Sequence, residues 1–458
     1  MTFPALRFPL RESHPPSGSV LAGSPGGQRI RLAAVGIGNR GAEVIRALHA
    51  TGLAEVVALC DTELGARHTL GILTEFPRAA PFRDFRRMFD RMAGQIDAVC
   101  VSTPDFSHFP IVMAAMAQGK HVYVEKPMAH TFRQIELMMA AERRYGVACQ
   151  MGNQGRAGAG YFQFKAWVEA GIIRNVTRIT AFMNYPRRWH GLSVPGPLPA
   201  QAQPAGVDWD AWLATTAPHA YHPGYLNGDW RSWYEFGNGA LGDWGAHLID
   251  HAHEFLELGL PIEVNPVRID GHSPHLFPQA STLRFTFPAR GTQPPVEFTW
   301  YDGQANPPPL PADFGEPVTD PTIPPPLGHS PSGTMPPPGK VIYGEDLTFQ
   351  GGSHATELKI IPEVKAKDLA SRLPAVPPVG SNHYRNFLLA VRGEETCRAN
   401  FAVSGPLCQA LALGVIAQRL NARLIFDPAT KRVTNDRAAN DLLEGPTPRP
   451  EWAEFYRL

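Results

Sequence analysis

The sequence has few cysteines and no excess of charge of either sign. Its five cysteines, Cys60, Cys100, Cys149, Cys397 and Cys408, form no CxxC pair, and the first three lie in or beside apolar, strand-like runs. This pattern indicates buried thiols and argues against a disulfide framework or a zinc site. The 42 basic and 42 acidic residues cancel, so no long-range field attracts nucleic acid or an anionic membrane. We therefore expect a small-molecule partner, without nucleic-acid or membrane partners.

Long hydrophobic runs are also missing. No uninterrupted apolar run reaches the roughly 18 residues that cross a bilayer. Residues 1–28 are rich in Pro, Gly and Ser and lack the apolar segment of a secretory signal. We expect a flexible tail on a cytoplasmic protein, or on a periplasmic one if a signal segment has been removed.

Residues 30–151 alternate short β-rich runs with helical periodicity. A parallel sheet with crossover helices requires this alternation, so we expect an α/β chain that begins with a Rossmann domain at 29–152. The expected strands are 30–35, 55–60, 98–102, 121–125 and 147–151. The expected helices are 40–50, 109–118 and 131–145, the last capped by Thr131.

Residues 153–458 have a different texture, with longer β-rich runs whose apolar residues alternate. The runs 176–183, 281–287, 296–301 and 358–361 predict an antiparallel sheet with one covered face. Thirteen prolines between Pro307 and Pro338 cannot donate to a sheet, so about 303–340 is expected to be a surface insertion or an extended arm. Two helical patterns, within about 382–420, follow it and are expected to pack back toward the first domain.

A glycine motif follows the first expected strand and opens the first expected helix. It reads Gly36-Ile37-Gly38-Asn39-Arg40-Gly41. The first glycine permits a tight turn, the second lets the backbone approach a pyrophosphate and the third allows close helix packing, while the helix N-terminus offers free N–H donors. A turn without a ligand is the alternative interpretation, but the ordered strand, motif, helix and strand favour a dinucleotide site.

Asp61 ends the second expected strand, twenty residues after the last motif glycine. Its carboxylate would accept hydrogen bonds from the adenosine ribose and repel a 2′-phosphate, which favours NAD over NADP. Arg40 leaves the alternative open, because a guanidinium there could pair with a phosphate.

Two further segments carry recognisable motifs. Residues 101–108 read VSTPDFSH and 118–127 read QGKHVYVEKP, and residues 237–250 read GNGALGDWGAHLID. Together they resemble the Gfo/Idh/MocA family, which is named after glucose-fructose oxidoreductase, inositol dehydrogenase and a rhizopine catabolism protein. The resemblance spans about residues 30–257, and residues 382–387 are similar too. The proline-rich insertion and the first 28 residues depart from the family pattern.

The resemblance implies a Rossmann domain joined to an α/β domain with a large, mostly antiparallel, open-faced sheet. That sheet often forms a subunit interface, so a homo-oligomer, a dimer or a tetramer, is expected. The family acts on sugars, cyclitols or related polyols with nicotinamide. The expected cofactor contacts are Gly36, Gly38, Asn39, Arg40, Gly41, Asp61, Ser102, Thr103, Pro104, His108, Glu125, Lys126, Pro127, Asn153 and Gln154.

Hydride transfer from an alcohol needs a base near neutral pKa and a cation that stabilises the alkoxide, and Lys126 and His247 have this chemistry. By resemblance, Lys126 lies beside the nicotinamide ribose and the reacting hydroxyl, Asp243 orients the substrate and His247 is the acid/base. The resemblance also implies a cis Lys126-Pro127 bond. The alternatives are a solvated lysine at a strand end and a hydrogen-bonded core histidine.

A metal site is a further alternative. Asp243, His247 and His251 are spaced four apart, so in one helix they would share a face and could hold a metal. The segment contains no HExxH, and the resemblance explains two of the three residues without a metal. We therefore expect no metal.

Aromatic and polar residues cluster in apparent loops, at 185–190 and 221–234. Sugars lay apolar faces on aromatic rings while polar tips hold their hydroxyls, so this mixture suits a carbohydrate pocket. The alternative is ordinary loop packing, which we favour for residues 209–213. Besides Asp243 and His247, the expected substrate residues are Tyr185, Arg188, Trp189, His190, His222, Trp230 and Arg231.

Three functions remain open. The first is an NAD-dependent oxidoreductase acting on a sugar, glycoside or cyclitol. The second is an NAD-dependent glycoside hydrolase that oxidises, eliminates, hydrates and reduces with bound NAD; His190, Tyr221, His222 and His247 are its candidate acid/base groups. The third is a non-catalytic sugar or redox sensor, against which Lys126, Asp243 and His247 argue, because a pure binder needs no proton-transfer set.

Overall fold

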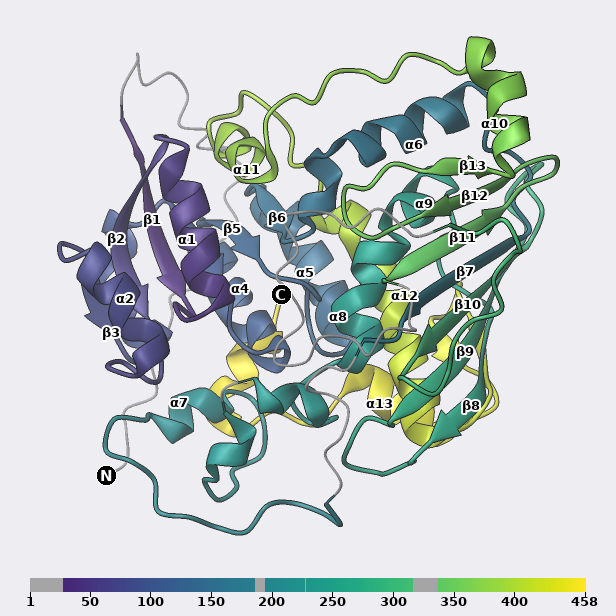
Figure 1. Cartoon of the computed structure of the whole chain (residues 1–458). Coiled ribbons are helices and arrows are strands. Elements are labelled where there is room, and N and C mark those ends of the chain that lie inside the picture. The colour runs from purple at the N-terminus through teal and green to yellow at the C-terminus, as the bar shows by residue number, and fades with distance from the viewer. Residues whose placement is uncertain (1–27, 186–193, 227, 316–336) are drawn as a thin grey trace.

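A six-stranded parallel sheet forms the N-terminal part of the computed structural model, which describes residues 28–185, 194–226, 228–315 and 337–458 (Figure 1). The spatial order β3-β2-β1-β4-β5-β6 is that of a dinucleotide-binding Rossmann sheet. Its strands are β1 (Ile30–Val35), β2 (Ala54–Cys60), β3 (Ala80–Phe82), β4 (Ala98–Val101), β5 (His121–Val124) and β6 (Cys149–Met151). Its helices are α1 (Arg40–Ala50), α2 (Arg67–Glu75), α3 (Phe85–Met92), α4 (His108–Ala117) and α5 (Phe132–Tyr145).

The expected strands and helices of this domain are confirmed to within two residues. Thr131 caps α5 in a reciprocal capping box with Gln134, as predicted. Sequence patterning missed β3, α2 and α3. Strand β3 is a three-residue edge strand centred on Pro81, and a proline removes the pattern by which a strand is recognised.

A nine-stranded, mostly antiparallel sheet forms the second domain, in the order β13-β12-β11-β7-β10-β9-β8-β14-β15. Only the neighbours β7 and β10 run parallel, so the expectation of a mostly antiparallel sheet is confirmed. Its strands are β7 (Arg178–Met183), β8 (Glu263–Asp270), β9 (Ala280–Phe287), β10 (Val296–Asp302), β11 (Gly339–Tyr343), β12 (Thr348–Gly351), β13 (Lys359–Ile361), β14 (Leu424–Asp427) and β15 (Arg432–Val433). Its helices are α6 (Ala159–Glu169), α7 (Trp209–Leu213), α8 (Gly239–Leu248), α9 (Asp250–Phe255), α10 (Glu363–Leu369), α11 (His383–Val391), α12 (Phe401–Leu420) and α13 (Arg437–Glu444).

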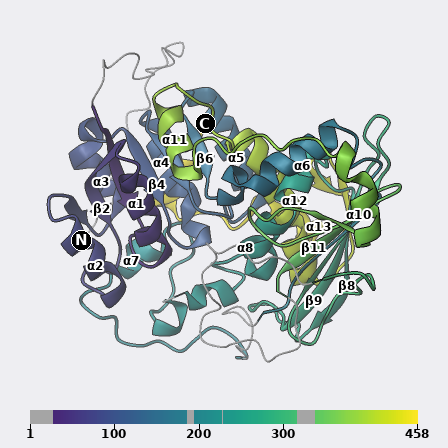
Figure 2. The same cartoon turned by 45° about the horizontal axis from the view of Figure 1, so that its top comes forward.

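Helices α8 and α12 lie between the nine-stranded sheet and the Rossmann domain (Figures 1 and 2). Residues 303–315 of the proline-rich insertion lie over the opposite face, where the Phe314 ring is 6.0 Å from the Phe182 ring of β7. Most of the remaining insertion falls outside the described residues. Helix α12 is long and apolar enough to cross a membrane by length and composition alone. In this structure, however, 78% of its most apolar 18-residue stretch is buried inside the protein.

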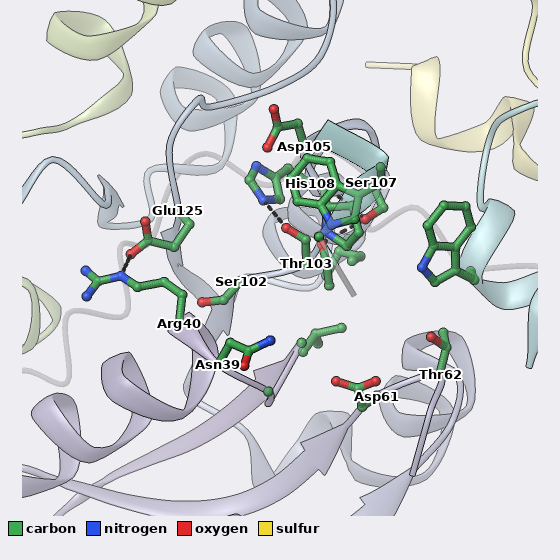
Figure 3. A pocket seen from close by; sticks show the side chains of 18 of the residues that line it. Asn39, Arg40, Asp61, Thr62, Ser102, Thr103, Asp105, Ser107, His108 and Glu125 are labelled. Carbon is green, nitrogen blue, oxygen red and sulfur yellow. Dashed lines mark hydrogen bonds and ion pairs between the residues drawn. The ribbon is translucent and has the colours of Figure 1, made fainter. Parts of the chain in front are cut away.

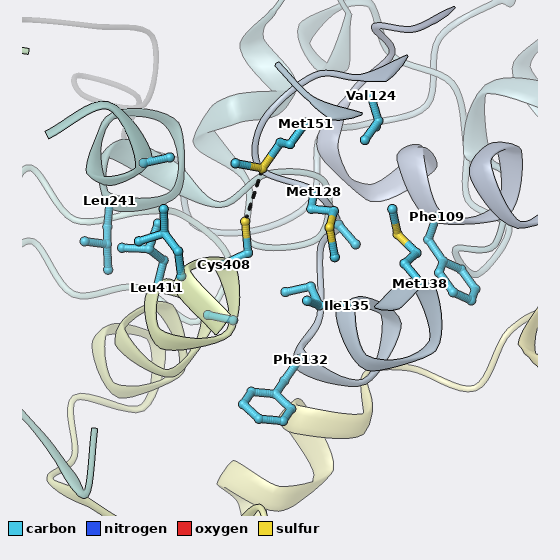
Figure 4. Close-up of a cluster of buried hydrophobic side chains, with 14 of the residues drawn as sticks. Phe109, Val124, Met128, Phe132, Ile135, Met138, Met151, Leu241, Cys408 and Leu411 are labelled. Atoms are coloured by element: carbon cyan, nitrogen blue, oxygen red, sulfur yellow. Dashed lines mark hydrogen bonds between the residues drawn. The ribbon is translucent and has the colours of Figure 1, made fainter. Parts of the chain in front are cut away.

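One apolar core joins the two domains (Figure 4). Cys408 of α12 lies 3.5 Å from the sulfur of Met151 in β6, and Leu241 of α8 packs in the same cluster. All five cysteines are buried and free, which confirms the expectation from the sequence. The C-terminal part of the chain also returns to the Rossmann domain, where Phe387 of α11 packs 5.8 Å from Tyr123 of β5.

Candidate active site

A cavity of about 470 Å³ lies at the carboxyl edge of the parallel sheet and is lined by both domains. It extends from the glycine loop after β1 past the ends of β2, β4 and β5 to helices α7 and α8. Figure 3 shows the part of its lining that follows β1, β2, β4 and β5. Ligands of open α/β sheets bind at this edge, where the strand order reverses beside β1.

The glycine loop has the backbone shape that a dinucleotide requires. Gly36 has φ +79°, and a Cβ there would lie 2.6 Å from the Ser102 carbonyl carbon. A Cβ on Gly41 would collide with the Gly36 carbonyl oxygen, so α1 can approach the loop this closely only with glycine. Gly38, Asn39 and Arg40, at the N-terminus of α1, line the cavity, which is where a helix-terminus diphosphate site is expected.

Asp61 and Arg40 lie on opposite sides of this loop (Figure 3). Asp61 accepts hydrogen bonds from the backbone N–H groups of Ile37 and Glu63, each at 3.0 Å, and lines the cavity. The Arg40 guanidinium instead binds Glu125 at 3.1 Å, Glu43 at 3.0 Å and the Tyr384 hydroxyl at 3.0 Å. In this conformation the guanidinium is therefore engaged by protein groups, while Arg40 also lines the cavity.

Lys126 reaches across the domain boundary to helix α8. Its ammonium forms an ion pair with the Asp243 carboxylate and donates to the Asp243 carbonyl at 3.0 Å. The two side chains are only 16% and 18% exposed, so Lys126 is not a solvated lysine at a strand end. The Lys126-Pro127 bond is cis, as expected.

His247 lies one helical turn after Asp243 and is stacked on a second histidine that the sequence did not indicate. The rings of His247 and His354 are 3.7 Å apart and inclined by 17°, and the backbone N–H of His354 donates to the backbone carbonyl of His247 at 2.9 Å. The Nδ1 atom of His247 is buried without a hydrogen-bond partner, unlike that of an ordinary core histidine. Burial, followed by the charges of His354 and Lys126, lowers the pKa of His247 well below its usual value. The imidazole is therefore neutral at neutral pH, and the same shift makes it a weaker base than an imidazole in water.

Asp105 is a titratable residue of the cavity that sequence reasoning missed. It is buried, lines the cavity and accepts hydrogen bonds from the backbone N–H of Asn238 at 3.1 Å and its Nδ2 at 3.3 Å. Burial raises the pKa of Asp105 to about 7; Arg231 and Lys126 oppose this shift and Asp243 adds to it. Its position directly after Pro104, at the carboxyl end of β4, was the available signal.

Twelve of the expected cofactor residues line this cavity. They are Gly36, Gly38, Asn39, Arg40, Asp61, Ser102, Thr103, Pro104, His108, Glu125, Lys126 and Gln154. Gly41, Pro127 and Asn153 lie behind this surface; Asn153 donates to the Ala246 carbonyl of α8 at 3.2 Å. His108 also joins two loops, because its ring nitrogens lie 2.9 Å from the carbonyls of Thr103 and Pro127.

The expected substrate residues are only partly brought together. Trp230 and Arg231 line the cavity, with the guanidinium 4.0 Å from the centre of the Trp230 ring. Tyr185 and His222 do not line it, because Tyr185 packs against the apolar core and His222 caps a short 3₁₀ helix through the Gly224 N–H. Arg188, Trp189 and His190 lie outside the described residues. Trp212 does line the cavity, against the expectation for residues 209–213.

The three residues that suggested a metal do not share one helix face. Helix α8 ends at Leu248 and α9 begins at Asp250, so His251 belongs to a new helix, where it contacts the Tyr161 ring at 5.4 Å. Within the part of the chain that the structure describes, no group of three or more His, Cys, Asp or Glu could hold a metal ion.

Comparison with known families agrees with this geometry. Residues 30–153 match the model described as "Oxidoreductase family, NAD-binding Rossmann fold", and residues 165–284 match the C-terminal alpha/beta domain of the same family. The chain therefore belongs to the Gfo/Idh/MocA family of NAD-binding oxidoreductases.

Curated relatives match over part of the chain. A glycosyl hydrolase family 109 protein of Streptomyces filamentosus is 34% identical over 149 residues, 30% of each chain. The rhizopine catabolism protein MocA of Rhizobium meliloti is 28% identical over 34% of this chain and 47% of its own. An inositol 2-dehydrogenase of Salmonella paratyphi B is 28% identical over 31% of this chain and 43% of its own. The chain thus spans about a third to a half of the length of these relatives.

Solved structures share the fold over most of the chain. The WlbA dehydrogenase of Bordetella pertussis, in complex with NADH and UDP-GlcNAcA, has a TM-score of 0.56 at 18% identity and covers 87% of this chain and 99% of its own. A levoglucosan dehydrogenase in complex with NADH has a TM-score of 0.55 at 16% identity, over 86% of this chain and 98% of its own.

The raised pKa of Asp105 predicts a pH-dependent loss of stability. A carboxyl with a pKa near 7 in the folded protein, against 3.8 in the unfolded chain, holds its proton longer when folded, so stability falls as the pH rises between these values. Asp105→Asn removes this loss. The unfolding free energy of the variant relative to wild type should rise by at least about 1 kcal/mol from pH 4.5 to pH 8 in urea titrations.

Asp97 is the matched control, because its contacts with Arg31 hold its pKa below the usual value despite the opposing effect of burial. Asp97→Asn should show no gain in relative stability over the same interval. An Asp105→Asn difference that stays constant with pH would contradict the shifted pKa.

Proposed function

We propose that this protein is an NAD-dependent oxidoreductase that transfers a hydride between a hydroxyl of a sugar, glycoside or cyclitol and nicotinamide. The observation that carries the proposal is the convergence of Lys126, Asp243 and His247 on one cavity at the carboxyl edge of the Rossmann sheet. Similar proteins include an inositol 2-dehydrogenase and a levoglucosan dehydrogenase, which supports the polyol class of substrate.

The cavity fits a nicotinamide dinucleotide. The turn has room only for glycine at Gly36 and Gly41, as the close approach of loop, helix and strand in a dinucleotide site requires. Asp61 places a carboxylate at the end of β2, where an adenosine ribose is bound in this fold. Ser102, Thr103 and Gln154 line the path between this end and Lys126. When bound, NAD supplies the hydride acceptor.

The residues near Lys126 divide the remaining chemistry. The Lys126 ammonium stabilises the negative charge that develops on the reacting oxygen, and Asp243 holds that ammonium in place. Neutral His247 accepts the hydroxyl proton on its imidazole. Trp230 and Trp244 present apolar ring surface to the cavity, which suits the C–H faces of a sugar.

NAD-dependent glycoside hydrolysis is the second candidate. The cavity holds a second imidazole, His354, and the carboxyl of Asp105, which are more proton-transfer groups than one hydride transfer uses. The relative named glycosyl hydrolase family 109 supports this candidate too. Tyr221 and His222, expected as acid/base groups, do not line the cavity.

The first test follows NADH absorbance and sugar release together on a panel of free polyols and aryl glycosides. Steady NADH formation with a free polyol supports the dehydrogenase. Sugar release without net NADH, lost when the cofactor is stripped, supports the hydrolase. Inactivity on the whole panel despite tight NAD binding would contradict both enzymatic proposals and favour a non-catalytic sensor.

On the active substrate, Lys126→Ala and His247→Ala should each lower turnover at least about a hundredfold, because each removes a group that acts on the reacting hydroxyl. Circular dichroism should show that both variants keep the fold. His253→Gln is the matched control, since His253 is equally buried but binds the Gly259 carbonyl outside the cavity. Turnover at the wild-type level in either cavity variant would refute its assigned role.

We further propose a preference for NAD over NADP, because Asp61 and Glu63 place two carboxylates at the adenosine end while Arg40 is engaged elsewhere. Fluorescence titration should give a Kd at least about tenfold lower for NAD, and Asp61→Ala should reduce that ratio by weakening NAD alone. Tighter binding of NADP by the wild-type protein would contradict this.

A further inference from the structure

A short segment of the second domain closes the adenosine end of the cavity. Residues 205–214, which include α7, cross to the edge of the Rossmann sheet (Figures 1 and 2). The backbone N–H of Asp208 donates to the carbonyl of Thr62, the residue that follows Asp61, at 2.8 Å. Ala211, Trp212 and Ala214 line the same cavity as Asp61 and Thr62. Helix α7 is therefore the wall that faces an adenosine bound at Asp61.

The wall ends in a strained turn. Ala214 has φ +46° and ψ −118°, a backbone conformation that residues with a Cβ rarely adopt. It is buried, with 1% of its surface exposed. Such a conformation persists only where surrounding contacts hold it, so the source of those contacts matters.

Arg449, far along the chain, supplies them. Its Nε and Nη2 donate to the Ala214 carbonyl at 2.9 and 2.6 Å, and Nη2 also donates to the Asp210 carbonyl at 3.0 Å. Its Nη1 forms an ion pair with the Asp210 carboxylate. The Arg449 side chain is 7% exposed, so these carbonyl bonds are shielded from water.

The C-terminal segment that carries Arg449 is fixed to the Rossmann domain. Residues Pro450–Tyr456 form a 3₁₀ helix whose Trp452 is fully buried. The Trp452 ring lies 5.9 Å from that of Phe85, which itself lines the cavity, and the Arg86 guanidinium lies 4.3 Å from the Trp452 ring. Arg449 thus connects the turn at the end of α7 to a C-terminal segment that packs against α3.

We propose that Arg449 is a positioning residue of the cofactor site, which holds the strained turn at Ala214 so that α7 stays closed over the adenosine half of the bound dinucleotide. Opening α7 must either break the shielded carbonyl bonds of Arg449 or draw the C-terminal segment away from Phe85. Release of the cofactor is therefore slow in the intact chain. This inference goes beyond the proposed reaction, because it concerns retention of the dinucleotide whatever the substrate.

The test measures NADH release from the full-length protein by stopped-flow fluorescence, with excess NAD as the displacing ligand and no sugar present. Arg449→Gln should accelerate release at least about tenfold, because the amide replaces neither the paired donors nor the charge. Arg449→Lys, which retains one charged donor, should fall between this variant and wild type.

Two control variants separate positioning from general effects. Arg457→Ala removes an exposed arginine of the same segment and should leave the release rate unchanged. Asp210→Asn keeps the bonds to the Ala214 carbonyl and loses an ion pair whose carboxylate is 66% exposed, so release should change by less than about threefold.

Ala214→Gly distinguishes positioning of the turn from a general loss of folding. Glycine adopts the turn without strain, so in the Ala214→Gly background Arg449→Gln should accelerate release much less than it does in wild type. If Arg449→Gln fails to fold, the comparison of Arg449→Lys in both backgrounds replaces it. The proposal is overturned if folded Arg449 variants release NADH at the wild-type rate, if Arg457→Ala accelerates release equally, or if Ala214→Gly leaves the effect undiminished.

Discussion

The ion pair between Lys126 and Asp243 is the contact on which the candidate site depends. Lys126 follows β5 of the Rossmann sheet and Asp243 lies in α8 of the second domain, so the pair fixes one domain against the other at the cavity. Taking both charges out of water is costly, and removal of either partner would leave the other uncompensated. Because His247 lies one turn further along α8, the same contact sets the distance between the ammonium and the imidazole.

The cofactor domain is completed by residues distant in the sequence. Arg40, at the start of α1, is held by Glu125 and by the Tyr384 hydroxyl of α11, and the Tyr384 ring stacks 5.9 Å from that of Tyr123. Figures 1 and 2 show α11 beside the Rossmann helices, although more than two hundred residues separate it from β6. The glycine loop is thus braced by the C-terminal half of the chain, and the two domains cannot be understood as independent modules.

The parts of the fold that were predictable share a local cause. The central strands of a parallel sheet are buried on both faces, so β1 and β4 read as short apolar runs, and the glycine turn needs glycines at fixed positions. The missed parts have no local cause. His354 reaches the site only because the chain turns back onto α8. No residue spacing in the sequence predicts its contact with His247. Likewise, α8 and α9 read as one helix although they are separate at Ile249.

Burial determines the protonation states of Asp105 and His247 in the cavity. The same loss of water that raises the pKa of Asp105 to about 7 lowers that of His247, so an acid and a base coexist at neutral pH in one cavity. A dehydrogenase needs only the base, whereas a cycle of elimination and hydration needs both. Since Lys126 and the dinucleotide site serve either reaction, the position of the substrate relative to Asp105 and His354 decides between them. The second domain supplies Trp230 and Arg231 to the lining of this cavity, where they can contact a substrate.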